Sequence, residues 1–123
     1  MSGNKLFIDT NIALYLLNGD ETLSTFLYGK ELYISVITEL ELLGFSNISK
    51  EEENIIKEFI SNCTIIPINT KIKVETILLR RKYKTKLPDS IIAASSLNLN
   101  LPFVSADTEF NKISELTFVF YEQ

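Results

Sequence analysis

The sequence predicts an α/β domain with a mainly parallel central sheet flanked by helices. Short apolar, β-rich runs alternate with segments of helical pattern, which is typical of parallel strands joined by helices. In addition, two apolar runs end in an acid, "KLFID" at Asp9 and "LPFVSAD" at Asp107. Sites in open parallel sheets form beyond the carboxyl ends of the strands, where the strand order reverses. The length of 123 residues fits one domain, residues 1–123.

Local patterns place the elements in order. The expected strands are the runs "KLFI" (5–8), "LYISV" (32–36), "CTIIPI" (63–68), "LPFVSAD" (101–107) and "LTFVFYE" (116–122). The expected helices cover about 11–17, 21–28, 37–45, 50–61, 71–83 and 88–99. Ser49 and the acids at 51–53 mark a helix start, because a hydroxyl caps the first turn and acids there favour the helix dipole. Thr70 is expected to cap the next helix, and Pro88 suits a first turn.

The composition excludes several classes of chemistry. The chain has no histidine and one cysteine, Cys63, so it has no histidine-dependent triad and cannot build the usual zinc sites. One cysteine also suits the reducing cytoplasm. We expect no signal peptide at Met1–Lys5 and no membrane span, since no apolar run is long enough. The net charge of −4 disfavours a nucleic-acid partner, unless the acids hold cations that reverse the local charge.

Each candidate acid also has a purely structural interpretation. Asp9 and Asp107 are suitable helix caps, and Asp89 gains from the dipole in the first turn of its helix. Glu39 and Glu41 diverge by about 200° on one helix. In that helix Leu40 and Leu43 are expected to face inward, and geometry alone leaves open which glutamate faces a site.

Taken together, the acids predict a metal site. A cluster of carboxylates without counter-charges repels itself, so it must bind a cation, take up protons or stay apart. Hard divalent cations with oxygen ligands, Mg²⁺ or Mn²⁺, solve this repulsion.

Several stretches together resemble the PIN-domain family, and among its members the toxin ribonucleases of bacterial VapBC toxin–antitoxin systems. They are "FIDTNIALYLL", "ISVITELELL" and "LPDSIIAASSLNLNLPFVSAD", with Phe110 after them. The resemblance spans nearly the whole chain. It implies a three-layer PIN-like fold with a mainly parallel central sheet flanked by helices.

The resemblance also assigns site residues. Its motif acids fall on Asp9, Asp89 and Asp107, and the acid three residues after a threonine selects Glu41 over Glu39. Thr10, Asn11 and Ser105 match polar positions that would hold water or phosphate. The final block departs from the family at Glu109, which stands where a second aspartate is common; the longer side chain makes Glu109 secondary.

The implied activity is a metal-dependent endoribonuclease that leaves a 5′-phosphate and a 3′-hydroxyl. Asp9, Asp89 and Asp107, with Glu41 partly through water, would hold one or two Mg²⁺ or Mn²⁺ ions. The resemblance further implies a cognate antitoxin as partner, whose groove would use part of Leu14, Tyr15 and Leu17, and a homodimer on other helical faces.

Seven of the twelve basic residues fall between Lys71 and Lys86, just before Asp89. One interpretation is a solvated helix face whose basic end complements the dipole. The other is that Arg80, Arg81 and Lys84 guide the RNA backbone toward the acids.

Two alternatives to a nuclease remain. A PIN-like domain without catalysis would act only as an RNA- or protein-binding module, which the presence of all four acids disfavours. Another acidic α/β domain, a phosphoacceptor receiver or a haloacid-dehalogenase-like phosphatase, is disfavoured because the first strand ends in one acid and Asn11 stands where the phosphatase needs a second aspartate.

Overall fold

The central sheet of the computed structural model, which describes residues 4–123, has five parallel strands in the order β3-β2-β1-β4-β5. The strands are β1 (Lys5–Ile8), β2 (Glu31–Ser35), β3 (Thr64–Ile66), β4 (Phe103–Ser105) and β5 (Phe118–Phe120). The strand order reverses beside β1, because the chain builds β2 and β3 on one side and returns to build β4 and β5 on the other. The crevice expected of this topology therefore lies between the carboxyl ends of β1 and β4.

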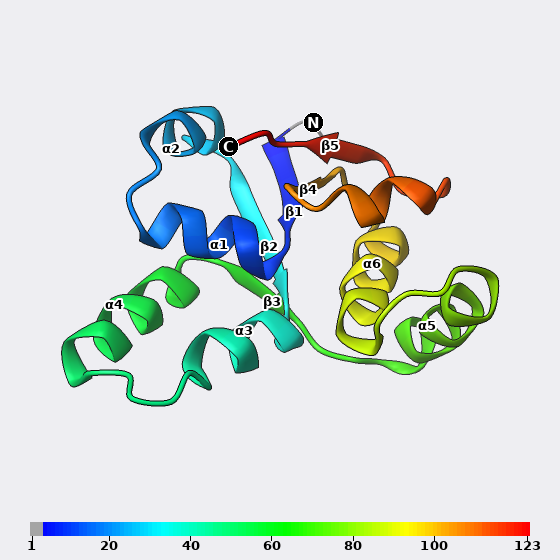
Figure 1. Ribbon diagram of the computed structural model, residues 1–123, viewed down its shortest axis with the longest axis horizontal. Helices are drawn as coiled ribbons and strands as arrows, with labels where there is room; N and C mark the ends of the chain where they lie inside the picture. The colour runs from blue at the N-terminus through cyan, green and yellow to red at the C-terminus, as the bar shows by residue number, and fades with distance from the viewer. Residues whose placement is uncertain (1–3) are drawn as a thin grey trace.

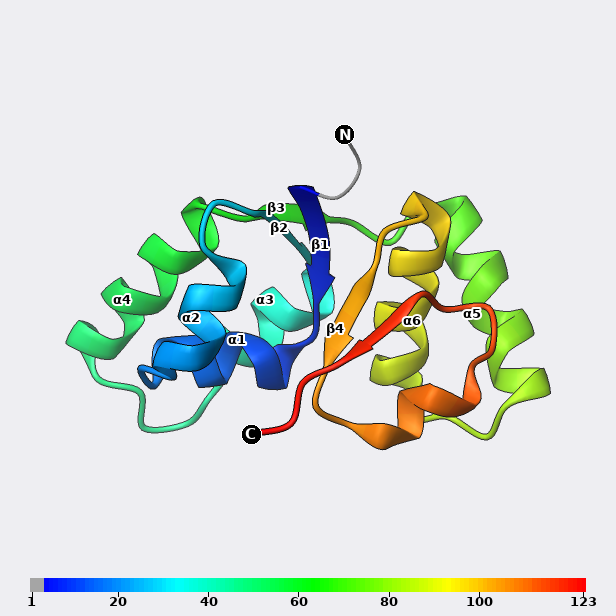
Figure 2. The ribbon, with the colours of Figure 1, turned by 90° about the horizontal axis from the view of Figure 1, so that it is seen from above.

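Helices cover both faces of the sheet and make three layers (Figures 1 and 2). On one face lie α1 (Thr10–Leu17), α2 (Glu21–Leu27), α3 (Val36–Leu43) and α4 (Lys50–Ser61). On the other lie α5 (Thr70–Lys82), α6 (Leu87–Leu99) and the short 3-10 helix η2 (Thr108–Lys112). The predicted fold class is confirmed.

The alternation of side chains along β1 divides the core between the two faces. Leu6 and Ile8 pack with α1, α2 and α4, whereas Phe7 packs with α5 and α6. All three are buried, as expected for a central parallel strand with helices on both sides. Phe7 pairs in register with Phe103, and Ile8 with Val104. This register brings the residues that follow β1 and β4 to the same edge of the sheet.

Two local predictions are wrong. Leu40 is 62% exposed, because Thr38 and Leu42, four residues apart, form the buried stripe of α3 and Leu40 lies on the opposite side. The cap of α5 is Asn69 and not Thr70, since Asn69 Oδ1 accepts a hydrogen bond of 2.8 Å from the backbone nitrogen of Ile72. Ser49 does cap α4, in a capping box with Glu52.

Within residues 4–123, no helix is long and apolar enough to cross a membrane. Residues 1–3, on which part of the signal-peptide prediction falls, lie outside the described residues.

Candidate active site

Asp9 lies where β1 ends and α1 begins. Its Oδ1 accepts a hydrogen bond of 2.9 Å from the backbone nitrogen of Ile12, so Asp9 caps α1. Its Oδ2 accepts a hydrogen bond of 2.6 Å from Oγ of Ser105, at the end of neighbouring β4. The residue is only 4% exposed. The capping interpretation and a place in the crevice are therefore compatible for Asp9.

Burial raises the pKa of Asp9 to about 6 from its ordinary value of 3.8. The hydrogen bonds from Ser105 and Ile12 act in the opposite direction, and the negative charges of Asp107 and Asp89 raise the pKa further. A buried carboxylate with two acidic neighbours is costly to ionise. A nearby cation would lower that cost.

Asp107 is joined to Asp9 through one hydroxyl group. Ser105 Oγ donates to Asp9 and accepts a hydrogen bond of 2.9 Å from the backbone nitrogen of Asp107. Asp107 Oδ1 in turn accepts a hydrogen bond of 2.9 Å from the backbone nitrogen of Glu109, so Asp107 caps η2. Ser105 is fully buried and fixes the spacing between the ends of β1 and β4.

Glu41 reaches the same region from α3. Its Oε1 accepts a hydrogen bond of 2.5 Å from Thr10 Oγ1, and Thr10 Oγ1 also lies 2.9 Å from Thr38 Oγ1. Because the single proton of the Thr10 hydroxyl goes to Glu41, the hydroxyl of Thr38 must donate to Thr10. A chain of two hydroxyl groups therefore holds Glu41 against the start of α1. Glu39, in contrast, does not line the pocket that contains Glu41 and Thr10.

Asp89 stands in the first turn of α6 and is half-buried. Burial raises its pKa above the ordinary value, and the charges of Asp107 and Glu41 act in the same direction, whereas Lys86 lowers it. No hydrogen bond or ion pair joins its carboxylate to any residue of the described chain. Asp89 is therefore the acid with the most freedom to turn toward a ligand.

The four predicted acids line one cleft, which we call the acidic cleft. It has a volume of about 610 Å³ and lies at the reversal point of the sheet. Its lining also includes Thr10, Asn11, Lys86, Pro88 and Phe110. Folding thus brings together residues from the ends of two strands and from two helices.

The acids fit a hard divalent cation by chemistry and by place. All of the candidate ligands are carboxylate oxygens, the type that Mg²⁺ and Mn²⁺ prefer. Among residues 4–123, however, no three acidic side chains stand close enough together to hold one ion as they are placed. Glu41 faces Thr10, and Asp107 faces the backbone nitrogen of Glu109. Side-chain rotation is therefore needed to close a ligand set, and the role of these acids as ligands stays a prediction.

The basic residues are placed differently from what the sequence indicated. Arg80 and Arg81 lie exposed in the last turn of α5, and neither lines the acidic cleft. Lys84 lines a smaller neighbouring pocket, and Lys86 lines both. Sequence reasoning missed Lys86, although its position three residues before Asp89, in the same run of lysines, was a usable signal.

Comparisons with known proteins identify the family and the fold of the chain. A sequence model of the PIN domain family matches residues 6–116. No curated protein sequence matches the chain.

Solved structures match nearly the whole chain. A chain of a toxin–antitoxin complex from Klebsiella pneumoniae is 30% identical, with a TM-score of 0.82 over 96% of this chain and 99% of that one. A chain of VapBC2 from Rickettsia felis, bound to a DNA fragment from its promoter, is 21% identical with a TM-score of 0.85, over 96% and 99% of the two chains. A chain of VapBC-1 from nontypeable Haemophilus influenzae is 24% identical with a TM-score of 0.77, over 94% and 97%. The chain therefore belongs to the PIN-domain family, and it has the fold of the chains that it matches in these toxin–antitoxin and VapBC structures.

Proposed function

We propose that this protein is a Mg²⁺- or Mn²⁺-dependent endoribonuclease of the cytoplasm and the toxin of a type II toxin–antitoxin pair. Members of the PIN family are in general nucleases, and the family match supports a nuclease here. The observation that carries the proposal is the acidic cleft itself. Asp9, Glu41, Asp89 and Asp107 come from distant parts of the sequence and line one cavity at the strand-order reversal.

The residues of the acidic cleft would have different roles. Asp9, Asp89 and Asp107 would bind the cation directly, and Glu41 partly through water. When bound, the cation supplies positive charge beside the scissile phosphate and acidifies the attacking water. Ser105 and Thr10 orient Asp9 and Glu41 through the hydrogen bonds described above. Asn11, exposed at the rim of the cleft, would bind phosphate oxygen.

The test compares RNA from cells that briefly express the wild type with RNA from cells that express Asp89→Asn. We expect new 5′-phosphate ends at defined sites with the wild type and none with the variant. Purified wild type should cleave the same RNA with Mg²⁺ or Mn²⁺ and should stop when EDTA is in excess. Equal fragments from both proteins, or full activity in EDTA, would overturn the proposal.

The alternative function is a PIN domain that binds RNA or protein without cutting. The distance between the acidic side chains as they stand is the observation in its favour. The same experiment decides, because a binding module leaves the 5′ ends of the RNA unchanged in both samples.

A cognate antitoxin would bind a second groove. This groove, of about 370 Å³, is lined by apolar side chains of α1, of the α3–α4 connection and of α4: Leu14, Leu17, Phe45, Ile48, Ile55 and Ile56. Leu14 and Phe45 also line the acidic cleft, so the two hollows adjoin. An amphipathic segment in this groove would reach the acids. Co-expression with the neighbouring gene product and purification test it: Ile55→Lys should reduce capture, and unchanged capture would exclude this groove.

A second copy of the chain would pack on α5. Its outer face exposes about half of three large apolar side chains, Val74, Ile77 and Leu78. Light scattering should give a dimer for the wild type and a monomer for Ile77→Lys; a monomeric wild type would exclude the dimer.

A further inference from the structure

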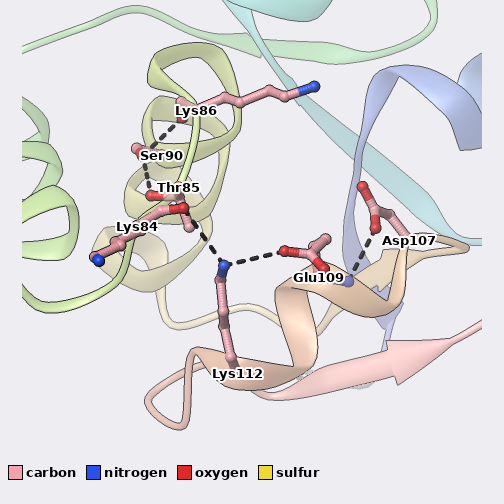
Figure 3. Close-up of polar contacts among 7 residues, drawn as sticks. All are labelled: Lys84, Thr85, Lys86, Ser90, Asp107, Glu109 and Lys112. Carbon is pink, nitrogen blue, oxygen red and sulfur yellow. Dashed lines mark hydrogen bonds and ion pairs between the residues drawn. The ribbon is translucent and has the colours of Figure 1, made fainter.

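A smaller pocket adjoins the acidic cleft on the side of α5. It has a volume of about 130 Å³ and lies between the loop of Lys84, Thr85 and Lys86 and the helix η2. Glu109 and Lys112 line it from η2 (Figure 3). We call it the lysine pocket. Lys86, Asp89, Asp107 and Phe110 line both hollows, so a chain lying in the acidic cleft can continue into the lysine pocket.

The loop wall of the pocket is held in place by hydrogen bonds. The hydroxyl groups of Thr85 and Ser90 are hydrogen-bonded to each other, and Ser90 Oγ donates a bond of 2.8 Å to the carbonyl of Lys86. Ser90 is fully buried in α6. The backbone that carries Lys86 is therefore anchored to the helix that carries Asp89.

Lys112 and Lys86, which both line the pocket, differ in their partners. Lys112 Nζ donates to Glu109 Oε1 at 3.0 Å and to the carbonyl of Lys84 at 3.5 Å, which ties η2 to the loop. Lys86 is exposed, and its ammonium group is bonded to no residue of the described chain. In Figure 3 the Lys86 side chain extends toward the side of Asp107 and away from Lys112, and the ammonium group of Lys84 also points away from Lys112. Lys86 must therefore turn toward η2 for both ammonium groups to bind one ligand in the pocket.

We propose that the lysine pocket binds the RNA phosphate next to the scissile one, with Lys86 and Lys112 as its ligands and Glu109 as an internal competitor for Lys112. This inference rests on the proposed nuclease function. A phosphate has enough oxygens to accept hydrogen bonds from both ammonium groups. Glu109, whose side chain is 73% exposed, is free to swing into solvent when the phosphate takes its place. In this arrangement Glu109 is not a metal ligand.

The substrate for the test is a synthetic RNA that spans a cleavage site found by 5′-end sequencing. Lys86→Ala, and Lys112→Met, which keeps the aliphatic stem, should each raise KM about tenfold. Lys112 lines the lysine pocket and not the acidic cleft, so Lys112→Met should also leave kcat within about twofold of the wild type. A plot of the log of the RNA-binding constant against the log of the salt concentration should become less steep by about 0.7 for each lysine removed, with single-stranded RNA. Lys73→Ala, which removes an exposed lysine in the first turn of α5, is the matched control. A KM for Lys86→Ala within twofold of this control overturns the inference.

A chemical change in the RNA identifies the group that the lysines bind. A methylphosphonate next to the scissile position removes one phosphate charge. It should weaken binding by the wild type about tenfold and add little to Lys86→Ala. Equal further losses in both proteins would show that Lys86 does not contact that phosphate.

Glu109→Gln separates the two possible roles of this acid. As a competitor, its loss should lower KM about two- to fivefold and leave the metal concentration for half-maximal activity unchanged. Glu58→Gln on α4 removes the same charge from a residue that lines neither the acidic cleft nor the lysine pocket, and it is the control. A higher metal requirement or a lower kcat would make Glu109 a metal ligand and overturn this part of the inference.

The experiments distinguish failure of the lysine-pocket inference from failure of the proposed nuclease function. If the wild type does not cleave RNA with Mg²⁺ or Mn²⁺, both are overturned. If the wild type cleaves RNA and the KM values of Lys86→Ala and Lys112→Met are unchanged, only the lysine-pocket inference is overturned.

Discussion

Ser105 donates a hydrogen bond of 2.6 Å to the carboxylate of Asp9, 96 positions earlier in the chain. Both residues are buried, and the bond closes the gap between the two strands at which the sheet order reverses. Four predictions test this bond and the groups around it, and a fifth tests the two arginines at the end of α5.

Removing the Ser105 hydroxyl should destabilise the protein more at pH 8 than at pH 4.5. The hydrogen bond from Ser105 favours the charged form of Asp9 and so lowers its pKa. At pH 8, Ser105→Ala leaves a buried carboxylate short of a donor, which costs about 1–3 kcal/mol. At pH 4.5 Asp9 is protonated in the folded protein and the loss is smaller. Urea unfolding at both pH values measures this. Ser95→Ala, which removes a buried hydroxyl that donates to a backbone carbonyl, should show no such dependence on pH.

Asp9→Asn should stabilise the metal-free protein at neutral pH and not in acid. The pKa of Asp9 is about 6 in the folded state against an ordinary value of 3.8. The wild type is therefore most stable, with respect to this group, below pH 3.8, and it loses stability as the pH rises through 6. The loss above pH 7 is up to about 3 kcal/mol.

The control for Asp9→Asn is Asp20→Asn. The pKa of Asp20 is lowered, first by its hydrogen bond from the Leu23 nitrogen, so its loss should destabilise at neutral pH. Equal effects of Asp9→Asn on the free energy of unfolding at pH 4.5 and pH 8 would contradict the assignment.

Mg²⁺ should raise the melting temperature of the wild type and not that of Asp9→Asn. A ligand at 100 times its Kd adds about 2.7 kcal/mol to stability, which corresponds to a rise on the order of 10 °C for a chain of this size. Asp20→Asn, outside the acidic cleft, should respond like the wild type. Equal responses of wild type and Asp9→Asn would argue against a metal site at the ends of β1 and β4.

Thr38→Val should lower nuclease activity without a large loss of stability. Thr38 is fully buried and its hydroxyl donates to Thr10, which holds Glu41. Valine keeps the shape, so we expect the free energy of unfolding to fall by about 1 kcal/mol, while Glu41 loses its fixed position and kcat falls. Thr38→Ser should restore kcat. Thr76→Val, whose hydroxyl bonds within α5, is the control. An unchanged kcat in Thr38→Val would show that the hydroxyl groups of Thr38 and Thr10 are not needed to position Glu41.

The double variant Arg80→Ala, Arg81→Ala tests the prediction that these residues guide RNA. If they contact phosphates, the salt slope of RNA binding falls by about 0.7 for each contact on a single strand. An unchanged slope would leave the two arginines as a solvated helix end.

The strands, most helices and the Ser49 cap were predictable because their signals are local. Apolar runs, Ser49 with its acids, and Pro88 each act within one or two turns of the chain. Leu40 was placed wrongly because its hydrophobicity gave no sign that Thr38 would take the buried position.

The site was predictable only in part. The ends of the apolar runs indicated Asp9 and Asp107. The choice of Glu41 over Glu39 needed the family resemblance, because both glutamates flank Leu40 at equal angles. The lysine pocket was not predictable from the sequence, because it exists only where η2 meets the α5–α6 loop and Lys112 bonds the Lys84 carbonyl. Nothing near Lys112 in the sequence indicates that contact.

The central position of β1 has a consequence for synthesis of the protein. β1 is synthesised well before β4, so the carboxyl end of β1 lacks its neighbour in the sheet until β4 has been made. A product that stops before residue 103 carries Asp9, Glu41 and Asp89 but lacks Ser105 and Asp107. Under the proposed function, a chain that stops before β4 is therefore expected to lack nuclease activity, because its acidic cleft is incomplete.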